Sequence, residues 1–237
     1  MKKTILALLA IFPMLVTIFV MKDLPETVAT HYDLYGNADA WGSKYTHFLM
    51  PCIIIVDAVI WYLVSLHFKE KAERATRDKE RAEALQNEKV MYLTAIGMTL
   101  FFTIEHICFM WSDIVEVREG LDHLAVDISS IMTGLSGILF IVFGNYLPKT
   151  KRNTLTGLRT KWSVSSDEVW AKSNRFAGIM LIITGLFSVA AAVFVGGIFS
   201  LVIMTSILLV SIFISVWYSH AVYKKLGGRD EDDEQDI

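Results

Sequence analysis

Six apolar runs constrain what this chain can fold into more than any other feature of its sequence. Each run holds about 20 residues, enough for a helix to cross the hydrocarbon core of a bilayer, roughly 30 Å thick. Hydrophobic residues make up 54% of the sequence, against roughly 45–50% in soluble domains. We therefore predict an all-α, polytopic membrane protein with six transmembrane helices. The runs are Thr4–Met21, His47–Phe68, Val90–Trp111, Leu124–Asn145, Phe176–Val195 and Ile198–His220.

The first run also resembles a secretory signal peptide, because Lys2 and Lys3 precede it. However, it is long for the apolar part of a signal, and no small-residue cleavage site follows Phe19. We expect a retained first transmembrane helix, in which Pro13 is the residue able to introduce a kink.

Lysine and arginine are distributed very unequally between the two sides of a six-span arrangement. The side that holds both termini carries 19 of the 22, and the other carries only Lys22, Lys44 and Arg118. Because loops rich in Lys and Arg stay in the cytoplasm, we predict cytoplasmic N- and C-termini.

This topology divides the chain into segments with different expected roles. Opposite charges four residues apart, such as Glu70 and Arg74, favour a solvated helix between spans two and three. The loop from Ser112 to about His123 is acidic and is expected to face outward. The expected segments are spans one and two with an extracytoplasmic loop at 22–46 (1–68), a charged cytoplasmic helical hairpin (69–89), spans three and four (90–143), a polar cytoplasmic segment (144–178), spans five and six (176–220) and an acidic cytoplasmic tail (221–237).

Asp57, Glu105 and His106 are ionisable residues that lie within the predicted spans, away from their ends. Such groups are costly in a membrane, so each is a functional candidate. Adjacent antiparallel helices can bring Asp57 near His106 or Glu105. Two interpretations stay open: a proton or cation relay, as in a small proton-coupled transporter or exporter, or a hydrogen-bonded pair that sets the helix register.

The sequence offers no recognisable catalytic or metal-binding motif. The histidines match no zinc spacing, and the chain has no GxSxG, Walker or dinucleotide pattern. A membrane enzyme that holds the phosphate of a lipid or peptidoglycan precursor at Asn153–Arg159 would need a set of catalytic carboxylates, and this side offers only Asp167 and Glu168, which a helix capping pattern explains. Cys52 and Cys108 lie within apolar runs and imply no disulfide framework. We expect no catalytic residue, no metal, no cofactor and no direct contact with nucleic acid.

Residues 144–178 form a dense polar and basic segment between two apolar runs. Pro148 is expected to end span four. Ser165 or Ser166 is a candidate helix N-cap, and Ser165 with Glu168 matches a capping box. The helix that follows is expected to run along the interface before it turns into span five. The many Asn and Gly residues favour a folded segment, which could bind an anionic headgroup, a partner protein or only its own neighbours.

This segment resembles the signature of the SdpI family of bacterial multi-span membrane proteins. The matching positions are Gly144-Asn145, Pro148-Lys149, Lys151, Asn153, Gly157, Arg159-Thr160, Trp162, Glu168, Trp170, Arg175 and Gly178. The outer loop is similar to a module that precedes the signature in longer members, at Leu24-Pro25, Thr30-His31, Gly36, Asp39, Trp41 and Lys44.

The resemblance implies a non-enzymatic immunity protein of the bacterial cell membrane, which gives resistance to a secreted peptide toxin or bacteriocin. The best-characterised members also act as receptors that sequester a winged-helix repressor at the membrane, so the resemblance implies this second role as well. The toxin would meet the outer face, and the repressor and membrane lipids would meet the cytoplasmic face. The candidate toxin- or partner-binding residues are Pro25, His31, Gly36, Asp39, Trp41, Asn145, Lys149, Asn153, Gly157, Arg159, Thr160, Trp162, Trp170 and Arg175.

Overall fold

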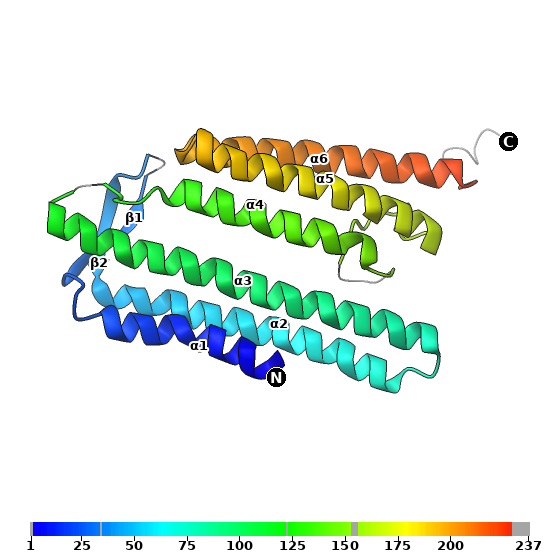
Figure 1. Ribbon diagram of the computed structural model, residues 1–237, viewed down its shortest axis with the longest axis horizontal. Helices are drawn as coiled ribbons and strands as arrows, with labels where there is room; N and C mark the ends of the chain where they lie inside the picture. Colours follow the sequence, from blue (N-terminus) through cyan, green and yellow to red (C-terminus); the bar gives the residue numbers. More distant parts are fainter. Residues whose placement is uncertain (1, 34, 122, 153–155, 229–237) are drawn as a thin grey trace.

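The computed structural model describes residues 2–33, 35–121, 123–152 and 156–228. Long helices dominate these residues and lie side by side in an elongated bundle (Figure 1). The helices are α1 (Lys2–Val20), α2 (Leu49–Arg74), α3 (Asp78–Glu119), α4 (Ile128–Tyr146), α5 (Asp167–Phe194) and α6 (Gly197–Lys225), with short 3-10 turns η1 (Lys44–Phe48) and η2 (Leu147–Lys149).

Five helices in the described part of the chain, α2 to α6, are long and apolar enough to cross a membrane. The apolar part of α1, Thr4–Val20, is shorter than these five. The protein is therefore a multi-pass membrane protein.

The bundle consists of two groups of helices, α1–α3 and α4–α6 (Figure 1). In the first group α2 packs along α3, and α1 packs on both. Leu6 and Ala10 of α1 form a small core with Ala58 of α2 and Ala95 of α3. In the second group α5 packs against both α4 and α6.

Helix α3 extends well beyond the predicted span at both ends. The prediction of an acidic loop that begins at Ser112 is wrong for residues 112–119, because these residues continue the helix. Gly120 ends it in the left-handed conformation, with φ at 66°, and its amide donates to the Glu116 carbonyl. At the other end three residues separate the start of α3 at Asp78 from the end of α2 at Arg74, and the predicted Glu70–Arg74 pair forms at 3.4 Å.

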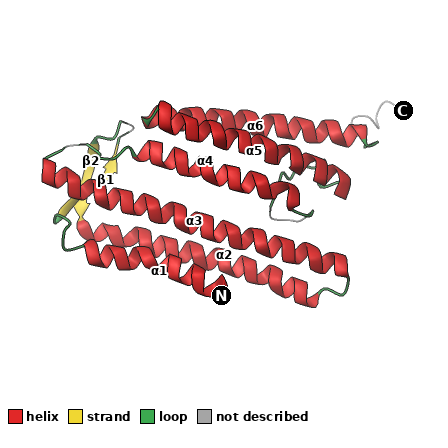
Figure 2. Ribbon diagram, in the orientation of Figure 1, coloured by secondary structure: helices red, strands yellow, loops and turns green. Residues whose placement is uncertain are grey.

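A β-hairpin covers the end of the bundle where α2 begins and α3 ends (Figure 2). Its strands, β1 (Thr27–Tyr32) and β2 (Ala38–Ser43), pair antiparallel with register shifts around His31. The all-α prediction omitted this hairpin. Asp33 accepts hydrogen bonds from the amides of Tyr35 and Asn37 in the connecting turn. Hydrogen bonds from the Asn37 side chain and backbone hold the pKa of Asp33 below its ordinary value.

Helices α4 and α5 approach each other closely through facing glycines. A Cβ atom added to Gly144 would lie 2.6 Å from the Gly178 carbonyl oxygen, and one added to Gly185 would lie 2.4 Å from the Gly137 carbonyl oxygen. No residue larger than glycine fits these backbones as they stand, and small residues are what allow close packing of helices in membranes.

A turn at Gly196-Gly197 joins α5 to α6, with positive φ at both glycines. Asp127, the N-cap of α4, accepts a hydrogen bond of 2.7 Å from the Gly197 amide and one of 3.0 Å from the Ser130 amide. Partial burial alone would raise the pKa of Asp127, but the hydrogen bonds from Ser130 and Gly197 outweigh it and lower the pKa. The Asp127 carboxylate therefore connects the adjacent ends of α4 and α6.

Candidate functional site

The hairpin end of the bundle holds a group of buried polar side chains, which we call the outer polar cluster (Tyr32, His47, Ser112, Asp113 and Glu116). The Tyr32 hydroxyl lies 3.3 Å from both Asp113 Oδ1 and Glu116 Oε1. His47 Nε2 lies 2.7 Å from Asp113 Oδ2. Both carboxylates are only 4% exposed. The cluster therefore joins the hairpin and the start of α2 to the end of α3.

Ser112 connects this cluster to the loop before α4. Its hydroxyl donates to Glu116 Oε1 over 2.7 Å and accepts from the Ala125 amide over 2.8 Å. Tyr32 has a single hydroxyl proton and can satisfy only one carboxylate at a time. Partial burial, together with the charges of Asp113 and Glu116, raises the pKa of Tyr32, so its phenol stays a neutral donor.

From the outer polar cluster a line of polar groups runs into the bundle. The rings of His47 and His106 have centroids 5.9 Å apart. His106 Nε2 lies 2.7 Å from Thr17 Oγ1, which donates its proton to the Pro13 carbonyl over 2.9 Å. Because a hydroxyl has one proton, Thr17 must accept from His106, and this assigns the ring proton to Nε2.

A pocket of about 320 Å³ opens beside the outer polar cluster, between the hairpin and α3. Two of the predicted outer residues, Pro25 and Trp41, line it together with Asp113 and Glu116. Trp41 is 57% exposed. An exposed indole beside two buried carboxylates can bind a cationic or amphipathic group of a peptide.

The other predicted outer residues lie elsewhere on the hairpin. His31 Nδ1 and Asp39 Oδ1 pair across its exposed face at 2.5 Å. Gly36 lies in the turn with φ at 86°, and its carbonyl accepts from the Leu124 amide over 2.9 Å. None of these three residues lines the pocket, so the structure separates them from Pro25 and Trp41.

Sequence reasoning missed the carboxylates of this site, because Asp113 and Glu116 were assigned to a solvated loop. One signal was available: His106, Asp113 and Glu116 are separated by seven and three residues. In a helix that spacing places all three on one face.

The three predicted intramembrane residues have different surroundings. Asp57 Oδ1 accepts from Trp61 Nε1 over 3.1 Å, and its other oxygen is buried without a hydrogen-bond partner among the described residues. His106 bonds to Thr17. In the described part of the chain no hydrogen bond or ion pair involves Glu105, although it is buried. The structure therefore describes no bond that joins Asp57 to Glu105 or His106.

At the opposite end of the bundle lies the signature segment, residues 144–178. The buried Trp170 donates from Nε1 to the Thr150 carbonyl over 3.0 Å. Asn174 accepts from the Leu158 amide over 2.7 Å and donates to the Trp170 carbonyl over 3.1 Å. Gly157 has φ at 108°, and a Cβ there would lie 2.6 Å from Asn174 Oδ1. Gly157, Trp170 and Asn174 thus form the core of a folded loop.

This loop is bound to the end of α6. The Thr160 hydroxyl lies 3.0 Å from the Ser219 hydroxyl, which also accepts from Ser173 over 3.2 Å. The Trp162 ring stacks on His220, with centroids 4.5 Å apart. Of the predicted residues here, Gly157, Thr160, Trp162 and Trp170 therefore pack within the protein.

Of the two candidate N-caps, Ser166 is confirmed: it accepts from the Val169 amide over 3.2 Å, whereas the Ser165 hydroxyl donates to the Trp162 carbonyl. Two other predictions for this segment are wrong. The capping box is therefore absent, and Glu168 pairs with Lys172 at 2.8 Å. Helix α5 runs without interruption from Asp167 to Phe194, so it has no separate interfacial part.

The remaining predicted residues lie on the surface. Asn145, Lys149, Arg159 and Arg175 are exposed, and Lys149 Nζ lies 4.7 Å above the Tyr146 ring. Arg159 and Arg175 make no hydrogen bond or ion pair within the described part of the chain. Asn153 lies outside the described residues. The signature segment thus presents exposed positive charge at this end of the bundle.

An ion-pair bridge connects the signature segment to the α2–α3 hairpin. Asp167 accepts from Lys79 Nζ over 2.7 Å and pairs with Arg152 Nε at 3.1 Å. Lys79 belongs to the first helical group and Asp167 to the second. No group of three His, Cys, Asp or Glu side chains suited to a metal ion occurs among the residues that were described.

The fold and its two polar ends define the class, a multi-pass helical membrane protein with a folded polar region at each end of the bundle. The sequence comparisons then show what the chain is similar to. Residues 149–218 match the SdpI/YfhL protein family, and residues 8–55 match a domain of unknown function, DUF1648. The chain is also 25% identical over 231 residues to the immunity protein SdpI of Bacillus subtilis (strain 168), covering 96% of this chain and 99% of that protein. The predicted resemblance to the SdpI family is confirmed. No solved structure matches the chain.

Proposed function

We propose that this protein is a membrane immunity protein that gives resistance to a secreted peptide toxin by binding it, without a chemical step. The main support is similarity to an immunity protein along nearly the whole chain. The matched ranges include the hairpin end at 8–55 and most of the signature segment at 149–218. Tyr32 and His47 of the outer polar cluster therefore fall within a matched range, whereas Asp113 and Glu116 lie outside both ranges.

The proposed topology has six spans, with both termini in the cytoplasm. The excess of Lys and Arg on the side of the signature segment supports this orientation. Packing of Leu6 and Ala10 of α1 against Ala58 and Ala95 supports α1 as a sixth span, since it lies within the apolar part of the bundle. The hairpin and the outer polar cluster then face outward.

The pocket beside the outer polar cluster is the proposed toxin contact. The lining of this pocket is the observation that supports its assignment as the toxin site. It combines an exposed aromatic ring, Trp41, with the buried carboxylates of Asp113 and Glu116. Trp is among the residues that most often carry the binding energy of protein contacts.

The signature segment is the proposed signalling face. Arg159 and Arg175 stand exposed on a rigid core built from Gly157, Trp170 and Asn174. Such a surface suits an acidic patch on a partner, and we propose that the partner is a winged-helix repressor. Substitution of Arg159 should then abolish repressor recruitment and leave membrane insertion intact.

The function is tested by expressing the intact protein in a toxin-sensitive bacterium and challenging it with peptide toxins encoded beside its gene. Survival at toxin concentrations that kill the control strain supports immunity. If protein shown to be in the membrane protects against none of these toxins, the proposal fails.

A further inference from the structure

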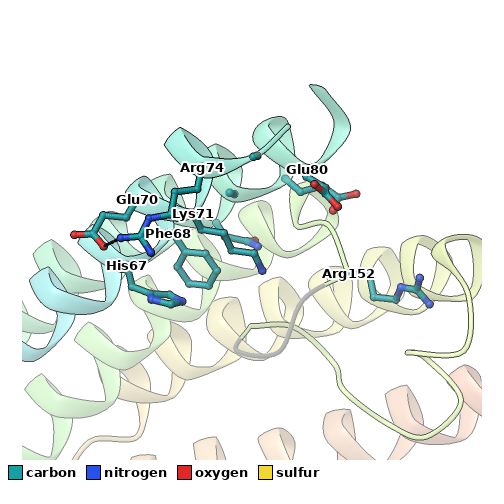
Figure 3. Close-up of a pocket in the computed structure, with 11 residues that line it drawn as sticks. His67, Phe68, Glu70, Lys71, Arg74, Glu80 and Arg152 are labelled. Carbon is teal, nitrogen blue, oxygen red and sulfur yellow. Dashed lines mark hydrogen bonds and ion pairs between the residues drawn. The ribbon is translucent and has the colours of Figure 1, made fainter. Parts of the chain in front are cut away.

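A second pocket lies where α2 ends and α3 begins, at the end of the bundle opposite the β-hairpin. Its volume is about 580 Å³, and it is lined by the last turns of α2, the first turns of α3 and Arg152. Figure 3 shows Lys71 and Arg74 on one side of this pocket and Arg152 on the other. The proposed immunity function does not use this pocket.

The charges around the pocket are balanced, with three basic and three acidic side chains. Arg74 is neutralised by Glu70 at 3.4 Å, and Arg152 pairs with Asp167. Lys71 makes no hydrogen bond or ion pair with any residue that the structure describes. A purely anionic ligand would gain from Lys71 but would also meet Glu80 and Glu83.

The Asn87 side chain adds an unsatisfied polar group to the pocket lining. It is only 4% exposed, and its Oδ1 has no hydrogen-bond partner among the described residues. A buried polar group without a partner is costly. Because an amide can turn to present either its oxygen or its NH₂ group, Asn87 can serve a donor or an acceptor on a ligand.

The position of the pocket indicates the source of that ligand. The apolar run of α2 ends at the buried Phe68, and charged residues begin at Lys69. Phe68 lines the pocket, so the pocket lies where the apolar span gives way to polar residues. In a bilayer, phospholipid headgroups occupy that level.

We propose that this pocket binds a phosphodiester that carries a primary ammonium group, the headgroup chemistry of phosphatidylethanolamine. The Lys71 ammonium binds the phosphate. The Glu83 carboxylate, which is 3.9 Å from Lys79 Nζ, and the Asn87 amide bind the ligand ammonium. A zwitterion matches the balanced lining, and the quaternary ammonium of phosphatidylcholine lacks the N–H donors that Asn87 and Glu83 require.

The test is native mass spectrometry of the full-length protein with phosphatidylethanolamine, phosphatidylcholine or phosphatidylglycerol. Phosphatidylethanolamine should bind most tightly. Lys71→Gln should weaken that binding about tenfold, the scale of one charge-assisted hydrogen bond. Lys69→Gln is the matched control, because Lys69 pairs with Glu73 at 3.6 Å and does not line the pocket. Lys71 is exposed, so its substitution should leave the melting temperature unchanged.

Soluble phosphoethanolamine separates two sources of the same chemistry. If it displaces the lipid, the pocket recognises the headgroup alone; if it does not, the acyl chains also contribute, and either result supports the zwitterion site. Equal binding of the three lipids, or unchanged phosphatidylethanolamine binding by Lys71→Gln, would overturn the proposal.

Discussion

His47 and Asp113 lie 66 residues apart in the chain, yet His47 Nε2 is 2.7 Å from the Asp113 carboxylate at the outer end of the bundle. Both side chains are almost fully buried. This contact ties the start of α2 to the end of α3 and gives Asp113 its shortest hydrogen bond. Removing His47 leaves the buried Asp113 carboxylate with only the longer bond from Tyr32 among the side chains that the structure describes.

We expect His47→Ala to destabilise the protein by about 3 kcal/mol, the scale for breaking a buried pair from one side. Thermal unfolding in detergent measures this change. Glu26→Gln is the control, because the Glu26–Lys44 pair has one largely exposed partner and surface pairs contribute about 0–1 kcal/mol. Equal losses of stability in the two variants would show that His47 and Asp113 are not coupled as described.

The glycine contacts between α4 and α5 predict a position-dependent response to added methyl groups. Gly144→Ala should destabilise by about 1–3 kcal/mol, the usual range for overpacking, because its Cβ would lie 2.6 Å from the Gly178 carbonyl. Gly134→Ala should be tolerated, since its Cβ would meet Ala192 at an ordinary 3.5 Å. Both are measured by melting temperature, and a tolerated Gly144→Ala would refute the close approach.

Gly157 is predicted to be irreplaceable for steric reasons as well as for its positive φ. Gly157→Ala should open the signature segment, because the new methyl group would collide with Asn174 and the Trp170 ring. Limited proteolysis across residues 150–166 measures this opening. Gly227→Ala separates the two causes, because Gly227 has φ at 85° with nothing within 4 Å of an added Cβ. Similar protease resistance for Gly157→Ala and wild type would contradict the interlocked core.

The turn of the β-hairpin should lose stability only in acid. The folded-state pKa of Asp33 is lowered by the Asn37 hydrogen bonds, so its contribution is present above the unfolded value of roughly 3.9 and is lost as pH falls through the lower folded value. A carbon-13 NMR titration of the Asp33 carboxyl measures this pKa. Asn37→Ala should raise it, and an unchanged pKa would mean that Asn37 does not stabilise the ionised form.

The helices could be predicted from the sequence far better than their ends. Apolar runs report which residues lie in the membrane, so Val90–Trp111 was recognised as a span. The same helix continues to Glu119, where the left-handed Gly120 ends it. Hydropathy contains no signal for that ending. Likewise, adjacent Ser165 and Ser166 are equivalent in sequence, and only the backbone geometry decides that Ser166 is the N-cap.

The outer site could be predicted only in part, because it is assembled from distant segments. Trp41 and Pro25 were recognised through the family motif, but burial of Asp113 depends on Tyr32, 81 residues away. The hairpin itself was not recognised, because register shifts around His31 interrupt the alternation typical of a strand. Contacts between residues so far apart in the chain leave no local pattern in a single sequence.

The central claim is that toxin binds at the pocket lined by Trp41, and one comparison tests it most directly. The measurement is the lowest toxin concentration that kills a sensitive strain expressing wild type, Trp41→Ala or Tyr35→Ala in matched amounts in the membrane. Tyr35 is another exposed aromatic residue of the hairpin, 83% exposed against 57% for Trp41, and it does not line the pocket. We predict that Trp41→Ala lowers the tolerated concentration at least about tenfold, as expected for loss of a contact worth about 2 kcal/mol, whereas Tyr35→Ala protects like wild type. Full protection by Trp41→Ala would contradict the assignment of this pocket as the toxin site.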